Sequence, residues 1–143
     1  MENLGSPMQL TRGADYAVRA LIHMAEKPDG TRFLLPELAR MTGAPDDFLS
    51  KVLQALRRAG FIQSRRGRSG GFEILPSGRE ATMKSVVEAI DGPIRLNLCV
   101  SSDGICGRKG ECVAHSVWAR AQAALLKTLS SESIASLAQK TKQ

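Results

Sequence analysis

The sequence predicts a mainly helical fold with one small β hairpin (α+β), followed by a long C-terminal helix. Apolar residues recur at helical spacing through most of the chain, and two short strand-like runs flank a basic, glycine-rich turn. An Ala/Leu-rich stretch lies near the end. The 143 residues suffice for one sizeable core with an appendage, but not for two ordinary globular domains.

The first two helices follow residues 1–8, which lack periodicity and are expected to form a flexible arm. Apolar residues repeat at helical spacing from Thr11 to Lys27, where Pro28-Asp29-Gly30 ends the pattern. A shorter helix should come next and stop at Gly43, because glycine accommodates the left-handed conformation that ends many helices. The sequence thus predicts two helices separated by a loop.

A third helix is expected from Pro45 to Gly60. Pro45 fits a first helical turn, where no backbone donor is lost. The inward face is expected to consist of Phe48, Leu49, Val52, Leu56 and Ala59. Strands at 61–64 and 72–75 follow, joined by the turn RRGRSGG. Helix, turn, helix and hairpin together predict a winged helix-turn-helix domain over residues 9–92.

A fourth helix is indicated by Thr82 as N-cap and by Gly92-Pro93 as its end. Residues 93–112 are irregular and include the cysteines. Residues 111–140 should form a long helix to Leu129 and a final short helix. The long helix has a broader apolar face than one neighbour needs, so we expect a homodimer in which a partner helix covers the remainder. This face comprises Val113, Val117, Trp118, Ala121, Ala124, Leu125 and Leu129.

The charge is unevenly distributed. The chain carries a net charge of +6, and the stretch from Lys51 to Arg79, with seven basic residues against Glu73, accounts for all of it. A basic balance predicts a polyanionic partner, either nucleic acid or an anionic membrane. The sequence contains no apolar run of membrane-spanning length, and its first residues lack the order of a secretion signal. We therefore expect a cytoplasmic protein without a membrane partner.

Two basic or polar surfaces fit DNA. On the third helix Asp47, Ser50, Lys51 and Gln54 form one ridge that is suited to reading base edges, although any solvated helix face has such a ridge. In the hairpin turn, basic side chains beside three glycines suit phosphates or a minor groove, unless the turn is merely solvated. The candidate contacts in the turn are Arg65, Arg66, Arg68 and Ser69.

The three cysteines form a metal-ligand pattern. Cys99, Cys106 and Cys112 are spaced C-x6-C-x5-C, and His115 follows three residues after the last. Thiolates with an imidazole suit zinc or an iron-sulfur cluster, and the spacing does not separate these. Incidental thiols and a capping or surface histidine are the simpler readings, but Cys106 lies in a polar, glycine-rich stretch where a packed thiol is not expected.

An enzymatic function is not expected. A thiol enzyme needs a base and an orienting group around one activated cysteine, whereas these thiols are clustered and no second constellation is visible. The remaining alternatives are a sensing DNA-binding protein and a zinc-stabilised or metal-free dimeric DNA-binding protein without a sensing role.

Four segments, taken in order, resemble the IscR, NsrR and RirA family of transcription regulators over about residues 8–140. They are LTRGADYAVRALIHMA, FLSKVLQALRRAGFIQSRRGRSGGFEIL, SVVEAIDGPI and the cysteine segment. The resemblance implies a homodimer, joined through the long helix, that binds a palindromic operator. It also implies that the protein is a repressor whose affinity for the operator is controlled by an iron-sulfur cluster. The cluster would sense nitric oxide, iron or redox state.

The resemblance also implies a ligand set. Cys99, Cys106 and Cys112 match the family's three cluster thiolates, and His115 matches the histidine of IscR-type members. Asp15 matches the carboxylate that NsrR-type members supply from the partner subunit. A 2Fe-2S cluster with His115 is favoured over a 4Fe-4S cluster with Asp15. Within the ridge, Ser50 replaces a glutamate of IscR-like members, so the operator sequence is expected to differ.

Overall fold

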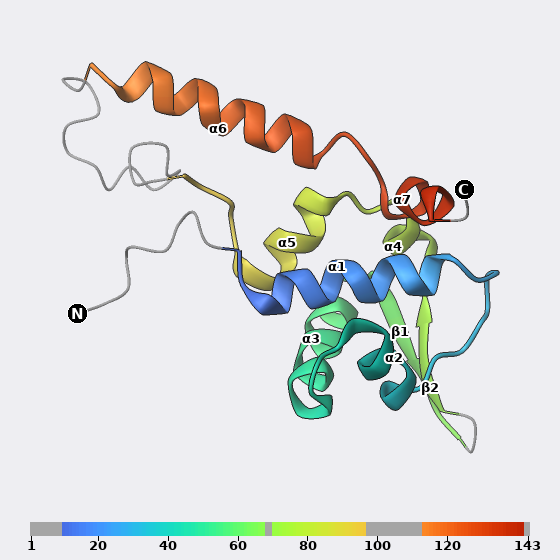
Figure 1. The fold of residues 1–143 in the computed structure, drawn as a ribbon. Coiled ribbons are helices and arrows are strands. Elements are labelled where there is room, and N and C mark those ends of the chain that lie inside the picture. Colours follow the sequence, from blue (N-terminus) through green and yellow to red (C-terminus); the bar gives the residue numbers. More distant parts are fainter. Residues whose placement is uncertain (1–9, 68–69, 97–112, 142–143) are drawn as a thin grey trace.

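The computed structural model describes residues 10–67, 70–96 and 113–141. It confirms the predicted fold class, a mainly helical chain with one two-stranded antiparallel sheet. The elements are α1 (Arg12–Ala25), α2 (Leu35–Thr42), α3 (Asp46–Arg58), β1 (Ile62–Arg65), β2 (Gly71–Ile74), α4 (Pro76–Glu80), α5 (Met83–Asp91), α6 (His115–Leu129) and α7 (Ile134–Lys140). Figure 1 shows α1 crossing the middle of the molecule, with α2, α3 and the hairpin below it and α6 above. None of the helices in the described ranges is long and apolar enough to cross a membrane.

The core is built around α1, which packs against α2, α3, α5 and α7. Leu21 and Met24 of α1 are completely buried. Gly13 allows a close approach of two helices, because a Cβ there would lie 3.2 Å from the Ile90 side chain of α5. The apolar faces of α1, α3 and α5 therefore meet in one core.

The last helix belongs to this core. Ile134 and Ala138 of α7 are buried, and the Ile134 amide donates to the Ala81 carbonyl oxygen at 2.7 Å. From the sequence we grouped this helix with the long helix before it. The structure instead packs it on α1 and α4, so the chain returns to the winged domain after α6 (Figure 1).

Three local features differ from the sequence expectation. Both strands are shifted by one residue, with Ile62 opposite Ile74 and Arg65 opposite Gly71. Phe33 pairs with the outer edge of β2 through two hydrogen bonds of 2.8 Å with Phe72. The five-residue helix α4 was not predicted, because one helical turn is too short to show a period. A single bridging residue such as Phe33 likewise shows no alternation.

The expected inward face of α3 is partly wrong. Phe48 is 39% exposed and Ala59 is also exposed, whereas Leu53, which we did not predict, is completely buried. Phe48 lies at the rim of the core, where its ring meets Tyr16 edge-on at 5.6 Å between ring centroids. Periodicity identifies the apolar side of a helix but not where the core ends on that side.

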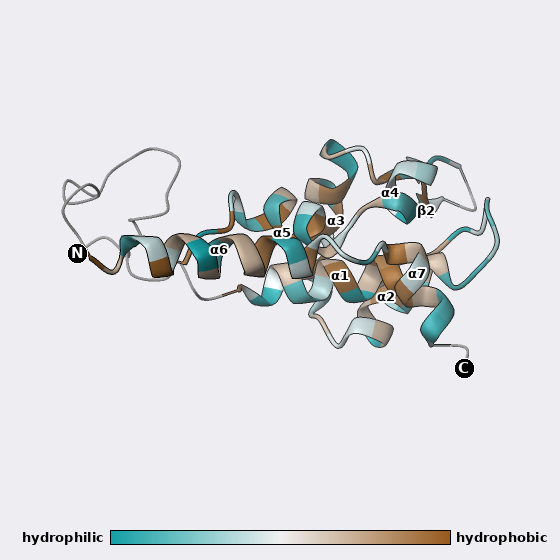
Figure 2. Cartoon of the chain, turned by 90° about the horizontal axis from the view of Figure 1, so that it is seen from above, coloured by the Kyte–Doolittle hydropathy of each residue, from teal (hydrophilic) through white to brown (hydrophobic). Residues whose placement is uncertain are grey.

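The long helix contrasts with the body, since α6 has no buried residue. Val117 is 53% exposed, and Trp118, expected to be a packing residue, is 40% exposed in the single chain. Figure 2 shows apolar and polar residues interspersed along α6. The expected start of the long helix, Glu111, lies outside the described residues, and the described part begins at His115.

Candidate nucleic-acid interface and the segment beside the cysteines

The turn between α2 and α3 is fixed by local hydrogen bonds. Gly43 has a φ of +80° and ends α2 in the left-handed conformation that the sequence predicts. The buried Thr42 hydroxyl donates to the Leu38 carbonyl oxygen at 2.8 Å and accepts from the Ala44 amide at 3.3 Å. These bonds set the angle at which α3 leaves α2, and hence the direction of its outer face.

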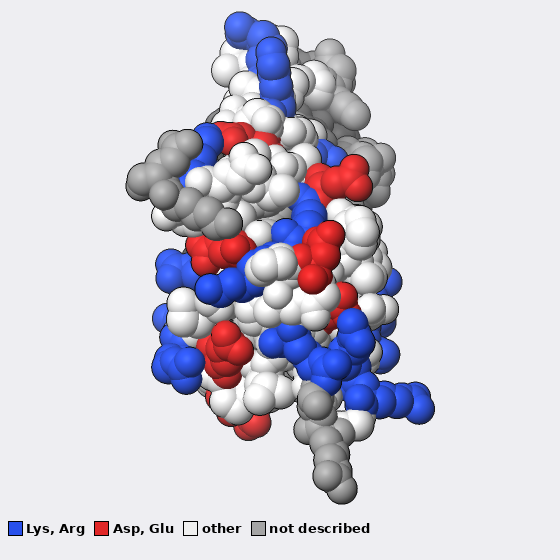
Figure 3. Space-filling view, turned by 90° about the vertical axis from the view of Figure 1, so that its right-hand side faces the viewer, with Lys and Arg blue, Asp and Glu red and all other residues white. Residues whose placement is uncertain are grey.

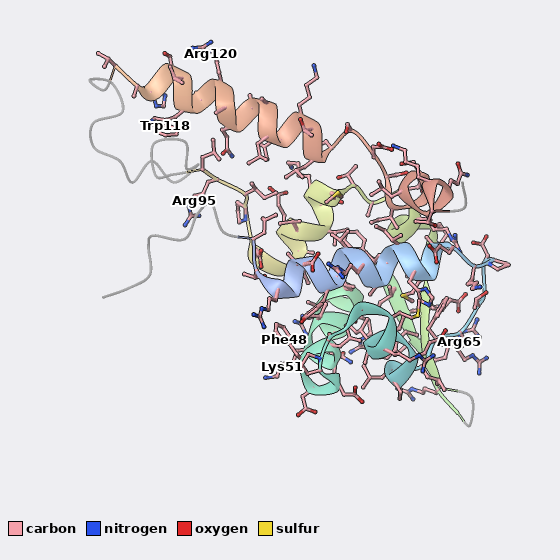
Figure 4. The ribbon with its side chains drawn as sticks, in the orientation of Figure 1. Phe48, Lys51, Arg65, Arg95, Trp118 and Arg120 are labelled. Atoms are coloured by element: carbon pink, nitrogen blue, oxygen red, sulfur yellow. The ribbon has the colours of Figure 1, made fainter. Side chains whose placement is uncertain are left out.

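The predicted ridge lies on the outer side of α3. Asp47 and Lys51 are exposed, and Ser50 and Gln54 are half-buried. Lys51 points away from the body (Figure 4). The Gln54 side-chain oxygen accepts from Arg57 Nε at 3.2 Å, and the amide donors of Gln54 make no hydrogen bond within the described residues. Lys51 and Gln54 therefore present hydrogen-bond donors, which suit the acceptor atoms of guanine or phosphate.

Sequence reasoning missed two residues beside this ridge. Phe48 shows part of its ring next to Lys51 (Figure 4), and Arg57 supplies a further cation on the last turn of α3. The periodic pattern assigned Phe48 to the core. Only the packing of α1 against α3 reveals that its ring reaches the surface.

The hairpin holds Arg65 in a cross-strand cluster. Glu73 lies directly opposite Gln63 in the strand register, and one Glu73 oxygen accepts from Arg65 Nε at 2.6 Å and from Gln63 Nε2 at 3.1 Å. These donors hold the pKa of the Glu73 carboxyl below its usual value. Arg65 is thus tied to the hairpin by its ion pair, although both Arg65 and Arg66 are exposed.

Lys and Arg side chains gather at the end of the molecule that carries the hairpin (Figure 3). Arg68 and Ser69, the other predicted wing contacts, lie outside the described residues. Arg79, the last cation of the basic stretch, has a structural role. Its guanidinium donates to the carbonyl oxygens of Ala25 at 3.0 Å and Lys27 at 2.7 Å, and so caps the end of α1.

The three predicted metal-binding cysteines, Cys99, Cys106 and Cys112, lie outside the described residues. The fourth predicted ligand, His115, is the first residue of α6 and is half-buried. Its Nδ1 atom is shielded from solvent and has no hydrogen-bond partner within the described ranges. Asp15, the alternative ligand, is exposed on α1 and pairs with Arg19 at 3.0 Å.

The polypeptide that leads into the cysteines is anchored on both sides. The Ile94 amide donates to a carboxylate oxygen of Glu88 on α5 at 3.3 Å. Gln122 of α6 donates its side-chain N–H to the Ile94 carbonyl oxygen at 2.6 Å, and its side-chain oxygen accepts from the Leu96 amide at 2.9 Å. Residues 94–96 are therefore held between α5 and α6.

Sequence comparison assigns the family. The chain matches the Rrf2 family, described as iron-dependent transcriptional regulator, over residues 10–140. This chain belongs to the Rrf2 family. The match includes the winged domain, the cysteines and the long helix, so it spans all the elements on which the sequence-based resemblance depended.

Two curated relatives are similar over part of the chain. A candidate HTH-type transcriptional regulator of Mycobacterium tuberculosis H37Rv is 38% identical over 87 residues, which are 61% of this chain and 54% of that protein. An rrf2-like candidate HTH-type regulator of Rhodobacter capsulatus is 38% identical over 95 residues, 64% of this chain and 63% of that protein. The matches thus span between 54% and 63% of these relatives' lengths.

Solved structures with the same fold include CymR, named as the global cysteine regulator of B. subtilis. It superposes with a TM-score of 0.74 at 21% identity and covers 92% of this chain and 97% of its own. T. potens IscR superposes with a TM-score of 0.73 at 20% identity, covering 93% and 88%. At these identities the likeness concerns the fold of the Rrf2 chain.

Proposed function

We propose that this Rrf2 protein is a DNA-binding transcription regulator, acting as a repressor on a palindromic operator in the cytoplasm. The observation that carries the proposal is the position of α3 and the hairpin, which lie on the side of the winged domain away from α6 (Figure 1), together with the exposure of Lys51 on α3 and Arg66 after β1. In this proposal α3 enters the major groove and the hairpin contacts phosphates or the minor groove. The helix then provides specificity and the hairpin mainly affinity.

The proposed regulator is a homodimer joined through α6. This helix has three sides in the single chain: Gln122 faces the body, Arg120 and Lys127 face solvent, and Val117 with Ala121 and Ala124 forms an exposed ridge. Figure 4 shows Arg120 pointing away from the body. An exposed ridge of small apolar residues on a helix with a separate polar side fits a second copy of the same helix.

The proposed signal receiver is an iron-sulfur cluster held by Cys99, Cys106 and Cys112, with His115 as the fourth ligand. The residues fit such a group, because thiolates and imidazole are its usual donors and His115 Nδ1 is shielded and unpartnered within the described residues. A bound cluster would supply chemistry that responds to nitric oxide, iron or redox state. A 2Fe-2S cluster is favoured over a 4Fe-4S cluster with Asp15 of the partner subunit as ligand.

A second candidate function keeps DNA binding and dimerisation without the cluster. The same donors suit tetrahedral zinc, and the structural neighbour CymR is named a cysteine regulator. In that case the three cysteines would stabilise the dimer, or respond to thiol chemistry, without iron.

The deciding experiment is an absorption spectrum with iron, sulfide and zinc analysis on protein isolated without oxygen. Visible absorption with iron and acid-labile sulfide supports the cluster proposal. A colourless protein with zinc, or one without metal after reconstitution, overturns it and leaves the second candidate. Operator binding by the cluster-loaded protein and the Cys99/Cys106/Cys112→Ala variant then tests sensing, which fails if both bind alike across salt concentrations.

A further inference from the structure

We propose that Gln122 is a positioning residue that ties the segment entering the cysteines to α6, so that the state of the cysteines reaches the DNA-binding domain through residues 94–96. The inference rests on the proposed function for the existence of a signal, but its structural basis is independent of any metal. It names the residue whose hydrogen bonds carry the connection.

The Gln122 side chain hydrogen-bonds to the backbone of residues 94–96 in the same way that a neighbouring β-strand would. Its amide uses both a donor and its acceptor, at 2.6 Å to the Ile94 carbonyl oxygen and 2.9 Å to the Leu96 amide. Ile94 and Leu96 are two residues apart, so one planar amide satisfies both backbone groups. Because Gln122 binds only backbone atoms, these hydrogen bonds do not depend on the side chains of residues 94–96. They fix the position of that segment.

Few other contacts hold α6 to the body. No residue of α6 is buried, and among the described residues Gln122 is the α6 side chain that hydrogen-bonds to another segment. A displacement of residues 94–96 would thus act on α6 mainly through this amide. The polar outer side of α6 makes no comparable bond in the described part of the chain.

Residues 94–96 are also connected to α3 through a short series of side-chain contacts. Glu88 accepts from the Ile94 amide, and α5 ends at Asp91, which accepts from the Thr11 hydroxyl at 2.6 Å and so holds the start of α1. Tyr16 of α1 then packs edge-on against Phe48 of α3. This series of contacts from α3 therefore reaches α6 at residues 94–96, and the hydrogen bonds of Gln122 form the connection.

The test uses Gln122→Met in the full-length dimer, which retains side-chain volume but removes both hydrogen bonds. Gln139→Met on α7 is the matched control, because Gln139 is exposed and its side chain makes no hydrogen bond in the described residues. Gln122→Glu keeps the acceptor for the Leu96 amide and loses the donor for Ile94. Two quantities are measured: hydrogen exchange at the Leu96 amide, and the ratio of operator Kd values between the cluster-loaded and cluster-free protein.

We expect Gln122→Met to speed exchange at Leu96 about tenfold, the size expected for the one hydrogen bond that the Leu96 amide loses, and to move the Kd ratio about fivefold toward 1. Gln122→Glu should fall between, and Gln139→Met should match wild type. Iron and sulfide content and the thermal unfolding midpoint should not change, which separates positioning from folding or cluster loss.

The outcomes separate the two proposals. Unchanged Leu96 exchange in Gln122→Met overturns the inference whether or not a cluster exists. If the Kd ratio of the wild type differs clearly from 1 and Gln122→Met has the same ratio, the inference about Gln122 is overturned. Cluster sensing is then still supported. A wild-type Kd ratio of 1, with faster Leu96 exchange in the variant, overturns sensing and with it the coupling role, leaving Gln122 as a structural anchor only.

Discussion

The winged body and the long helix α6 are built from similar amino acids but differ in how far a single chain buries them. In the body, Leu21, Leu53 and Leu56 are completely buried, whereas α6, although rich in Ala and Leu, has no buried residue. The helices of the body therefore cover one another's apolar faces within one chain, whereas the apolar side of α6 stays uncovered. The difference fits the proposed homodimer, in which a second copy of α6 would cover the exposed side of this helix.

The largest expected effect is obtained by placing a charge on the uncovered ridge of α6. Ala121→Glu should raise the dimer dissociation constant at least about 100-fold, because an unpaired carboxylate would be buried between two helices. Ala123→Glu, the same change on the solvent side of the same helix, should leave the dimer intact. Sedimentation velocity over a concentration series measures both. If the two variants associate equally, the ridge is not the dimer contact.

In the body, the substitution expected to have a large effect on stability is one that creates a cavity in the core. Leu53→Ala should lower the free energy of unfolding by about 2 to 5 kcal/mol, because it removes a completely buried side chain from the centre of α3 packing. Leu10→Ala, at a leucine that is 55% exposed, serves as the control. Denaturant unfolding monitored by circular dichroism gives both values. A loss below about 1 kcal/mol for Leu53→Ala would show that α3 is not part of a tightly packed core.

The proposed DNA-facing side of the body divides into two predicted roles. Lys51→Ala should cost about 1 to 3 kcal/mol of operator binding and relax base preference at one position, whereas Arg66→Ala should weaken all sequences alike and lower the salt slope by about one. Arg120→Ala on α6 should change neither. Fluorescence anisotropy with operator and scrambled DNA, at several salt concentrations, distinguishes them. Identical behaviour of the Lys51 and Arg66 variants would remove the distinction between the helix and the hairpin.

The smallest expected effect concerns the hairpin pair. The pKa of Glu73 is held below its unfolded value of about 4.5, so the pair with Arg65 stabilises the fold fully above that pH and is lost as pH falls through the lower, folded value. Glu73→Gln should cost up to about 1 kcal/mol at pH 7, and the difference from wild type should shrink in acid. Thermal unfolding from pH 7 to pH 3 measures this, with the exposed Glu80→Gln as control. A difference that does not depend on pH would exclude the ion pair as its source.

Much of the body could be predicted from the sequence because its signals are local. Gly43 and Gly92 end α2 and α5 as expected, and Thr82 caps α5 in a reciprocal pair with Ser85. The ridge of α3 follows from the helical period alone. In each case the residue and its partner are separated by a few positions or share one helix face.

The remaining features depend on contacts between distant parts of the chain. The exposure of Phe48, the cap that Arg79 places on α1 and the pairing of Gln122 with residues 94–96 join positions that no periodic pattern relates. The predicted ligands Cys99, Cys106 and Cys112 lie outside the described residues, so their roles stay predictions. By itself the sequence predicted the helices longer than one turn, the hairpin and the clustering of the cysteines and basic residues, because these depend on residue type and local spacing. The tertiary structure decided which side chains stay free to act, because burial and hydrogen bonding depend on what the rest of the chain brings beside them.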